Sequence, residues 1–320
     1  MRVRAAVLRD FGAPFSIEEV DVPVREGDRV VTVRATGICG RDVVVWRGGF
    51  RNLRPPLILG HEVFGVDEEG NPVGVYPGIV DEECLRAMRG RETLCPSYSI
   101  LGEGRPGGYA THVAVPAANL VRLPTPEFEK YAASVCGVAT FIHASRVAGV
   151  RRSDRVLVTG ASGGVGIHGV QYLINVVGAQ VYAHVRSEWK AKVLKDLGAA
   201  PVTDLGFYRR EGRVDFVFEI VGAPTINDSL LALNPGGTLV LVGNVTGEEI
   251  RLTRPAVVVM RELKIVGTAA YTLDEYAEAV RLVSQGAIRP FYRTYRLADV
   301  NAAYEAISRG EILGRAVLVP

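Results

Sequence analysis

Two cysteines, a histidine and a glutamate are the residues of this chain best suited to hold a metal ion. Cys39 lies in the segment GICGRD, His61 and Glu62 lie in GHE, and Cys136 follows much later, directly before a predicted helix. Thiolate, imidazole and carboxylate ligands suit tetrahedral zinc. A single cysteine or histidine is more often a core residue, so it is the combination that predicts a zinc site.

A glycine-rich turn follows the apolar strand RVLVTG and precedes a predicted helix. Backbone N–H groups at the positive end of a helix bind a pyrophosphate, and glycines let the chain turn tightly and approach that ligand. We therefore predict a βαβ dinucleotide-binding unit over residues 156–187. Its expected phosphate contacts are Gly160, Ser162, Gly163, Gly164, Val165 and Gly166. The alternative interpretation is a tight connection that binds no ligand.

The residues after the next strand, QVYAHV, indicate which dinucleotide is bound. In NAD enzymes an acidic residue about twenty residues after the glycine turn hydrogen-bonds the adenosine ribose. This chain instead has Arg186, Ser187 and Lys190. Cationic and hydroxyl donors attract a phosphate, so these residues favour NADP(H) over NAD(H). The alternative interpretation is that Arg186 and Lys190 are ordinary surface charges.

The order of the apolar segments predicts an α/β protein with two domains, because 320 residues exceed the usual size of one core. Up to about residue 125, short β-rich segments broken by glycine and proline indicate a mostly antiparallel β domain. From about 130 to 268, continuous apolar strands alternate with helices, which is typical of a doubly wound parallel sheet. Two amphipathic helices and a closing strand, RAVLVP, end the chain.

Composition excludes several classes of partner. A formal net charge of +2 provides no basic stripe for nucleic acid, and no segment approaches the roughly 20 apolar residues of a membrane span. The N-terminus lacks the apolar core of a secretion signal. We therefore expect a cytoplasmic protein that binds neither nucleic acid nor a membrane. Abundant arginine beside scarce glutamine hints at a thermostable protein.

These motifs, with GGYA, the SxxK segment and the terminal GRAVLV, together resemble the zinc-containing medium-chain dehydrogenase/reductase (alcohol dehydrogenase) family over essentially the whole chain. A similar GASGGVGIH turn occurs in archaeal acryloyl-CoA reductases, a quinone reductase-like group. The resemblance implies a GroES-like catalytic domain over residues 1–137 and 268–320, and a Rossmann domain over residues 138–267. It also implies a homodimer or homotetramer.

The resemblance assigns roles to individual residues. It implies one catalytic zinc per chain, held by Cys39, His61 and Cys136, with Glu62 as an exchangeable fourth ligand. Asp42 would orient a ligand or Arg315, and Thr140 would lie near the nicotinamide. The remaining expected cofactor contacts are Gly243, Asn244, Thr268 and Arg315, with Glu219 and Gly267 nearby.

Arg41 departs from the pattern of alcohol dehydrogenases, which usually carry Ser or Thr at this position to relay the alcohol proton. A relay histidine is also missing, since Val43, Val44 and Val45 occupy that stretch. Reduction of a carbonyl or of an activated C=C bond, protonated by water or by the substrate, remains feasible. Arg41 either contacts an anionic substrate such as a CoA thioester or is a solvent-facing charge.

A second departure concerns the structural zinc that many relatives hold through four cysteines. The corresponding positions here are Asp81, Cys84, Ala87 and Cys95. Because Ala87 cannot bind a metal, we expect no structural zinc. Cys84 and Cys95 form either a disulfide, which occurs in hyperthermophiles, or two free thiols.

Other conspicuous side chains have simpler interpretations. His112, His143 and His168 are expected to be packing residues rather than ligands. Trp46 and Tyr109 could line a substrate pocket, but a core role is the safer expectation.

Three functional hypotheses follow. The first is an NADPH-dependent zinc reductase of ketones or aldehydes, formally an alcohol dehydrogenase. The second is an enoyl or quinone reductase of the acryloyl-CoA type. The third, suggested by the missing relay, is a catalytically silent NADPH-binding protein with a regulatory role.

Overall fold

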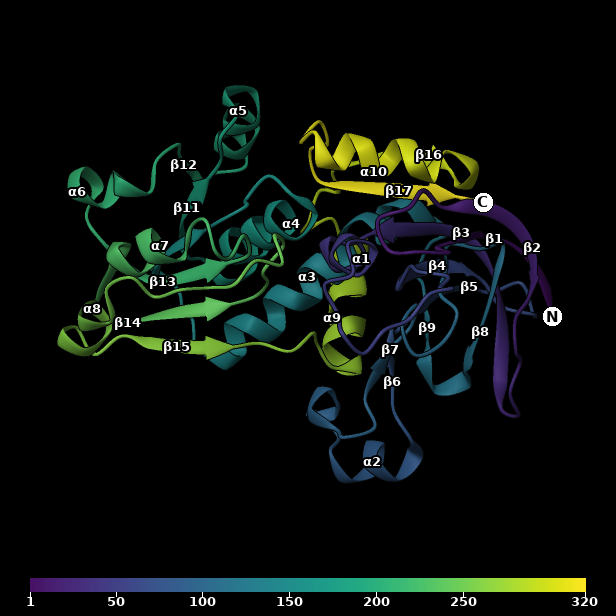
Figure 1. The fold of residues 1–320 in the computed structure, drawn as a ribbon. Coiled ribbons are helices and arrows are strands. Elements are labelled where there is room, and N and C mark those ends of the chain that lie inside the picture. Colours follow the sequence, from purple (N-terminus) through teal and green to yellow (C-terminus); the bar gives the residue numbers. More distant parts are fainter.

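The chain is built on two large sheets, with two small two-stranded ones, and the large sheets meet along the long helix α3 (Phe128–Ala148) (Figure 1). The computed structural model describes the backbone of residues 1–320 and every side chain except that of Glu82. Both termini lie beside the same sheet, on the right of Figure 1, while the middle of the chain forms the other sheet. The first unit is called the catalytic domain below, and the second the Rossmann domain.

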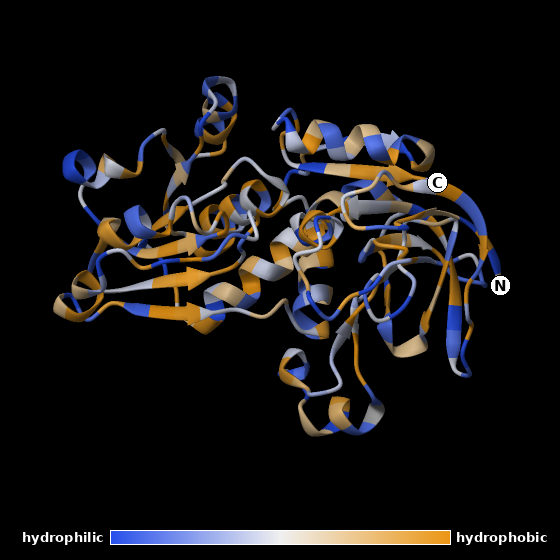
Figure 2. Cartoon of the chain, in the orientation of Figure 1, coloured by the Kyte–Doolittle hydropathy of each residue, from blue (hydrophilic) through white to orange (hydrophobic). Residues whose placement is uncertain are grey.

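Six parallel strands form the Rossmann sheet, in the order β12-β11-β10-β13-β14-β15. This is the strand order of a doubly wound dinucleotide-binding fold. Val156 and Val158 pack into one hydrophobic cluster with helix α4, while Leu157 packs into another with helix α7. Both faces of the sheet are therefore covered, which explains its continuous apolar strands (Figure 2).

The elements of the Rossmann domain have the following bounds. The strands are β10 (Arg155–Val158), β11 (Gln180–His184), β12 (Ala200–Val202), β13 (Val214–Glu219), β14 (Leu233–Leu241) and β15 (Lys264–Gly267). The helices are α4 (Gly164–Tyr172), continued by a π-helical turn η3 (Leu173–Val177), α5 (Glu188–Asp196), η4 (Leu205–Phe207), α6 (Tyr208–Glu211), α7 (Ile226–Ala232) and α8 (Pro255–Met260).

The catalytic domain contains a mostly antiparallel sheet in the order β16-β17-β3-β4-β5-β9, with β8 also paired to β3. Its strands are β3 (Asp28–Ile38), β4 (Glu62–Val66), β5 (Pro72–Val75), β8 (His112–Pro116), β9 (Leu120–Arg122), β16 (Tyr292–Arg296) and β17 (Arg315–Val319), beside the pair β1 (Arg2–Val7) and β2 (Ser16–Asp21). Its helices are α1 (Gly40–Trp46), η2 (Ala117–Asn119), α9 (Leu273–Ser284), η5 (Leu297–Asp299) and α10 (Val300–Ser308).

Helix α3 lies between the two domains because it is apolar on nearly every side. Val135, Val138 and Phe141 are completely buried, and the helix packs against both α4 and α9. Gly169 of α4 allows this contact, since an added Cβ would lie 2.2 Å from the Phe141 ring. Any residue on this helix is therefore held firmly at the domain boundary.

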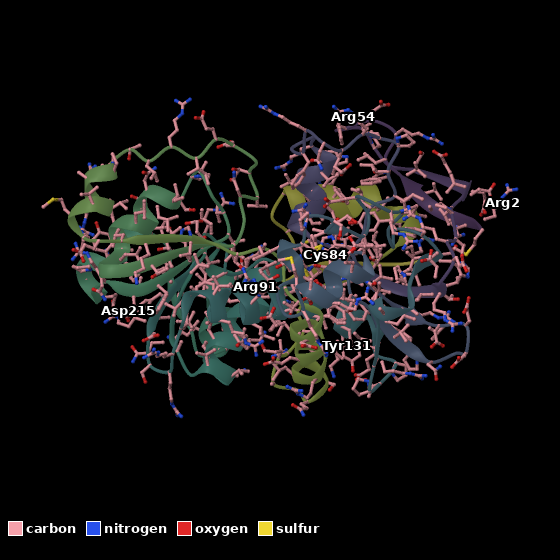
Figure 3. All side chains as sticks on the ribbon, turned by 90° about the horizontal axis from the view of Figure 1, so that it is seen from below. Arg2, Arg54, Cys84, Arg91, Tyr131 and Asp215 are labelled. Atoms are coloured by element: carbon pink, nitrogen blue, oxygen red, sulfur yellow. A yellow bond between two sulfur atoms is a disulfide. The ribbon has the colours of Figure 1, made fainter. Side chains whose placement is uncertain are left out.

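A small lobe extends from the catalytic domain, at the bottom of Figure 1. It consists of β6 (Gly78–Ile79), α2 (Glu82–Ala87), η1 (Glu92–Leu94) and β7 (Ser99–Ile100). Cys84 and Cys95 form a disulfide in this lobe (Figure 3). Of the two alternatives that the sequence left open, the structure therefore has the disulfide rather than two free thiols. The Glu92 carboxylate accepts a 2.7 Å hydrogen bond from the Leu273 amide and so joins the lobe to α9.

The predicted fold class, a GroES-like β domain with a Rossmann domain, is confirmed. The predicted domain boundaries stay predictions. Among the described residues, every helix is too short or too polar to cross a membrane.

Alkylation of unfolded but unreduced protein should label only Cys39 and Cys136, because the other two cysteines are disulfide-bonded. A Cys84→Ser/Cys95→Ser double variant should unfold in urea with a free energy lower by about 2–4 kcal/mol, because the bond restricts the unfolded chain. Four labelled thiols and an unchanged unfolding free energy would contradict this account.

Candidate metal centre and cofactor site

Cys39, His61, Glu62 and Cys136 converge on one point in the catalytic domain. Their ligand atoms all lie within 4.8 Å of one another, and all four side chains are buried. Antiparallel pairing of β3 with β4 brings Cys39, which follows β3, close to the start of β4. Cys136 lies within helix α3, not directly before a helix as predicted, because the helix already begins at Phe128. Three elements far apart in sequence thus build the predicted cluster.

The Glu62 carboxylate is buried without a hydrogen bond. Neither of its oxygens accepts one from the described residues, although Arg315 Nη2 lies 2.9 Å from Oε1 as an ion pair. Burial raises the pKa of Glu62 to about 8, against the attraction of Arg315. A buried carboxylate in this state lacks hydrogen-bond donors for its oxygens, and a metal ion would bind those oxygens directly. The residues present therefore fit zinc.

The other ligands of the cluster also favour a cation. A hydrogen bond from the Cys136 thiol lowers the pKa of Cys39 well below its usual value, and the same bond raises the pKa of Cys136. Burial opposes protonation of His61, but attraction to Asp42 and Cys39 raises its pKa well above the usual value. A metal ion would replace the protons that these groups otherwise share.

Asp42 fixes the histidine. Its carboxylate accepts a 2.8 Å bond from the Cys39 amide, and Oδ1 lies 3.2 Å from His61 Nδ1. The Tyr109 hydroxyl donates to the same carboxylate and in turn contacts Tyr304. With Nδ1 engaged, Nε2 of His61 is left to bind a metal. The role predicted for Asp42 thus has a geometric basis.

Gly37 was not singled out in the sequence, yet it makes room for Glu62. It pairs with Glu62 across the sheet, and a Cβ at this position would lie 1.9 Å from Glu62 Oε2 and 2.5 Å from the Ala132 carbonyl. Only glycine can occupy this position without displacing the carboxylate. Its location two residues before Cys39, in GIC, was the available signal.

Arg315 links the cluster to the glycine-rich turn. Its Nη1 donates to the Ile38 carbonyl, and its guanidinium lies so close to Gly164 that an added Cβ there would be 2.6 Å from Cζ. Gly137, which follows Cys136, approaches the Gly164 carbonyl in the same way, at 2.9 Å from an added Cβ. The metal cluster therefore adjoins the first turn of helix α4.

The glycine-rich turn has the geometry expected for a phosphate site. Gly160 adopts a positive φ of 61°, and the Gly163 amide closes the turn onto the Gly160 carbonyl. Helix α4 then begins without a side-chain cap, so the amides of its first turn, Gly164, Val165 and Gly166, lack intrahelical partners. Ser162 already accepts a bond from the Gly314 amide through its carbonyl oxygen.

The three residues predicted to bind the adenosine phosphate differ in their availability. Arg186 is exposed, and the Ser187 side chain caps no amide of helix α5. Lys190 instead donates to the carbonyls of Gly310, at 2.6 Å, and Ile312, at 2.8 Å, and is 7% exposed. The interpretation of Lys190 as a phosphate ligand therefore needs correction: its ammonium already has two protein partners.

Three further predicted positions, Gly243, Asn244 and Thr268, follow the carboxyl ends of strands β14 and β15. A fourth, Thr140, lies on α3. The Gly243 backbone amide donates to the Glu219 backbone carbonyl, and the Asn244 side-chain Nδ2 donates to the Glu248 backbone carbonyl. The Thr268 hydroxyl is buried without a partner among the described residues. Thr140 donates to the Cys136 carbonyl at 2.8 Å and so holds the ligand-bearing turn of α3.

The Glu219 carboxylate is hydrogen-bonded within its own loop. Its carboxylate accepts bonds from the backbone after β13 and from three hydroxyls, those of Thr159, Thr225 and Ser229. These bonds hold the carboxylate within its own loop, mostly through Oε1, while Oε2 accepts only from Ser229; the suggested contact of this side chain with the cofactor stays a prediction.

Arg41 is partly exposed and is engaged by another side chain. It forms an ion pair with Glu103, with Nη2 2.9 Å from Oε2, and its guanidinium lies 4.4 Å from the centre of the Phe50 ring. Both interpretations offered for Arg41 missed Glu103, which nothing in the local sequence indicated.

The remaining side chains pack as expected. His168 Nδ1 donates to the Gly164 carbonyl and Nε2 accepts from Phe291, and burial lowers the pKa of His168 to about 3. His143 bonds to Glu275, and His112 to Thr111. Tyr109 is fully buried, and Trp46 donates to the Ala13 carbonyl.

Comparison with known proteins agrees with this geometry. The family described as alcohol dehydrogenase GroES-like domain matches residues 25–125, and zinc-binding dehydrogenase matches residues 164–285. The chain is 31% identical to an acryloyl-coenzyme A reductase of Sulfurisphaera tokodaii, over 96% of each protein. It is 30% identical to an alcohol dehydrogenase of Geobacillus stearothermophilus, over 99% of this chain and 98% of the relative.

Two solved structures extend the likeness. AibC is 34% identical, with a TM-score of 0.87 over 100% of this chain and 96% of that one. A thermostable alcohol dehydrogenase from Pyrobaculum aerophilum, solved with cobalt and zinc bound, is 28% identical, with a TM-score of 0.91 over both complete chains.

The fold and the site together define an oxidoreductase that uses zinc and a nicotinamide dinucleotide. The chain belongs to the zinc-binding alcohol dehydrogenase family of medium-chain dehydrogenases/reductases.

Replacing Asp42 with alanine should weaken zinc binding by roughly 10–100-fold, because His61 would lose the partner that orients its ring. Competition with a chelator of known affinity measures the change. Tyr109→Phe, which removes only a hydroxyl partner of Asp42, should have a smaller effect. Unchanged zinc affinity in Asp42→Ala would refute the orienting role.

Proposed function

We propose that this protein is an NADPH-dependent zinc reductase that converts a ketone or aldehyde to an alcohol, or carries out the reverse oxidation. The observation that carries the proposal is the junction of the buried four-ligand cluster with the glycine-rich turn. Arg315 contacts both Glu62 and Gly164, and Cys136 is followed by a glycine packed on that turn. A substrate at the metal would thus lie beside the dinucleotide.

Zinc held by Cys39, His61, Glu62 and Cys136 would polarise a carbonyl oxygen, and NADPH would supply the hydride. The chain's own residues prepare this chemistry. Asp42 holds the His61 ring, Arg315 keeps Glu62 near the cluster, and apolar surroundings exclude water from the ligands. Because Arg41 is bound by Glu103, we assign protonation of the product oxygen to water rather than to a side chain at position 41.

The preference for NADPH rests on the end of strand β11. Arg186 is exposed and Ser187 has an uncommitted side chain, while an acidic residue to hold a ribose is missing from His184–Ser187. The Lys190 ammonium is engaged elsewhere, so Arg186 and Ser187 are the proposed 2′-phosphate contacts.

Arg186→Asp should lower the ratio of kcat/KM with NADPH to that with NADH by roughly 10–100-fold, because a charge-assisted hydrogen bond is lost and a repulsive charge is gained. Steady-state kinetics with both cofactors measures this ratio. Arg2→Asp makes the same change in net charge at the far end of the catalytic domain and should leave the ratio unchanged (Figure 3). An Arg186→Asp enzyme that keeps its preference would remove the assigned contact.

Reduction of an activated C=C bond is the second candidate function, favoured by the likeness to acryloyl-coenzyme A reductase. Reaction of an enone with NADPH deuterated at C4 separates the two functions. The proposal predicts deuterium on the carbinol carbon of an alcohol product. Deuterium on the β-carbon, with the carbonyl intact in every product, would establish C=C reduction instead.

The predicted assembly as a homodimer or homotetramer is retained as part of this proposal. The hypothesis of a catalytically silent protein is set aside, since the chain belongs to a family of enzymes and retains its complete ligand cluster.

A further inference from the structure

Lys190 is a buried cation that joins the two domains. It lies in the first turn of helix α5, in the Rossmann domain, and its Nζ donates to the carbonyls of Gly310 and Ile312. These carbonyls belong to the loop between α10 and β17, in the catalytic domain. An ammonium is costly to bury unless it is hydrogen-bonded, so these bonds explain why Lys190 remains 7% exposed.

The same loop contacts the glycine-rich turn. The Gly314 amide donates to the Ser162 carbonyl at 3.0 Å, and Gly163 and Gly314 form an isolated bridge. Gly314 has a φ of 78°, and an added Cβ would lie 2.0 Å from the Phe291 carbonyl, so only glycine fits. The loop is thus held at both of its ends by the Rossmann domain.

Directly after Gly314, Arg315 begins strand β17 and reaches Glu62 of the metal cluster. A continuous path therefore leads from the adenosine end of the proposed cofactor site to a metal ligand. It passes from Lys190 through the loop to Gly314 and Arg315.

We propose that Lys190 is an interdomain latch, a positioning residue that holds the Gly310–Gly314 loop against the Rossmann domain and so sets Arg315 beside Glu62. The inference rests on the proposed cofactor cleft but not on its preference for NADPH. The latch acts before a cofactor binds, because both of its hydrogen bonds are made within the protein.

Two other roles for Lys190 give different results. A contact with the 2′-phosphate would affect NADPH alone, and a contact with the adenosine ribose would affect both cofactors but not the cofactor-free protein. The latch affects the cofactor-free protein as well. Hydrogen exchange of the loop amides, measured without cofactor, therefore separates the three roles.

The test compares Lys190→Met, which keeps the length of the stem, with Lys192→Met on the exposed face of the same helix. In cofactor-free protein, amides of residues 310–315 should exchange about tenfold faster in Lys190→Met, as expected for the loss of hydrogen bonds to a charged group. They should be unchanged in Lys192→Met. The Kd values for NADPH and NADH should rise by a similar factor, so that their ratio is constant.

Lys190→Arg, which keeps a cation with several donors, should restore most of the protection and guards against a general folding defect in Lys190→Met. If the loop amides of Lys190→Met exchange at the unchanged rate, the latch is overturned. This holds whether the variant loses affinity for NADPH alone or for both NADPH and NADH. Whether the enzyme prefers NADPH is tested separately, by the ratio of kcat/KM with NADPH to that with NADH in Arg186→Asp.

Discussion

A carboxylate buried without a hydrogen bond is the constraint on which the architecture of the site depends. Glu62 lies among two thiols and an imidazole, and its charge is offset by the Arg315 ion pair and by attraction to His61. Such a group is costly in an apolar interior unless a cation neutralises it. Gly37 leaves room for it, and Asp42 aims His61 at the same point. These features have a common explanation if the four side chains bind zinc.

The ligands also explain how the domains are joined. Cys136 can reach the cluster only because α3 is buried between the two sheets, and Gly137 and Gly169 let that helix pack closely on α4. Arg315 reaches Glu62 from a different element, a strand that follows a loop hydrogen-bonded to the glycine-rich turn. The metal site and the dinucleotide site are therefore adjacent because the same helix and the same strand contribute to both.

Much of this was predictable from the sequence, and the exceptions share a cause. Continuous apolar strands and the glycine-rich turn predicted the Rossmann sheet, while residue types predicted the ligand cluster. The sequence did not predict the residues that bind three of the candidate side chains. Arg41 pairs with Glu103, Lys190 with the Gly310 loop, and Glu219 with nearby hydroxyls. These contacts join segments far apart in the chain or depend on which way a side chain turns, and neither property follows from local pattern. Gly37 likewise becomes informative only once strand register is known.

Zinc content measured by elemental analysis of the purified protein, with and without the Cys136→Ser substitution, tests the central claim most directly. The account predicts one tightly bound zinc per chain, lost when Cys136 is replaced, because only the buried cluster offers a complete ligand set among the described residues. Protein that binds no zinc when supplied with it, or that holds two per chain, would contradict the account.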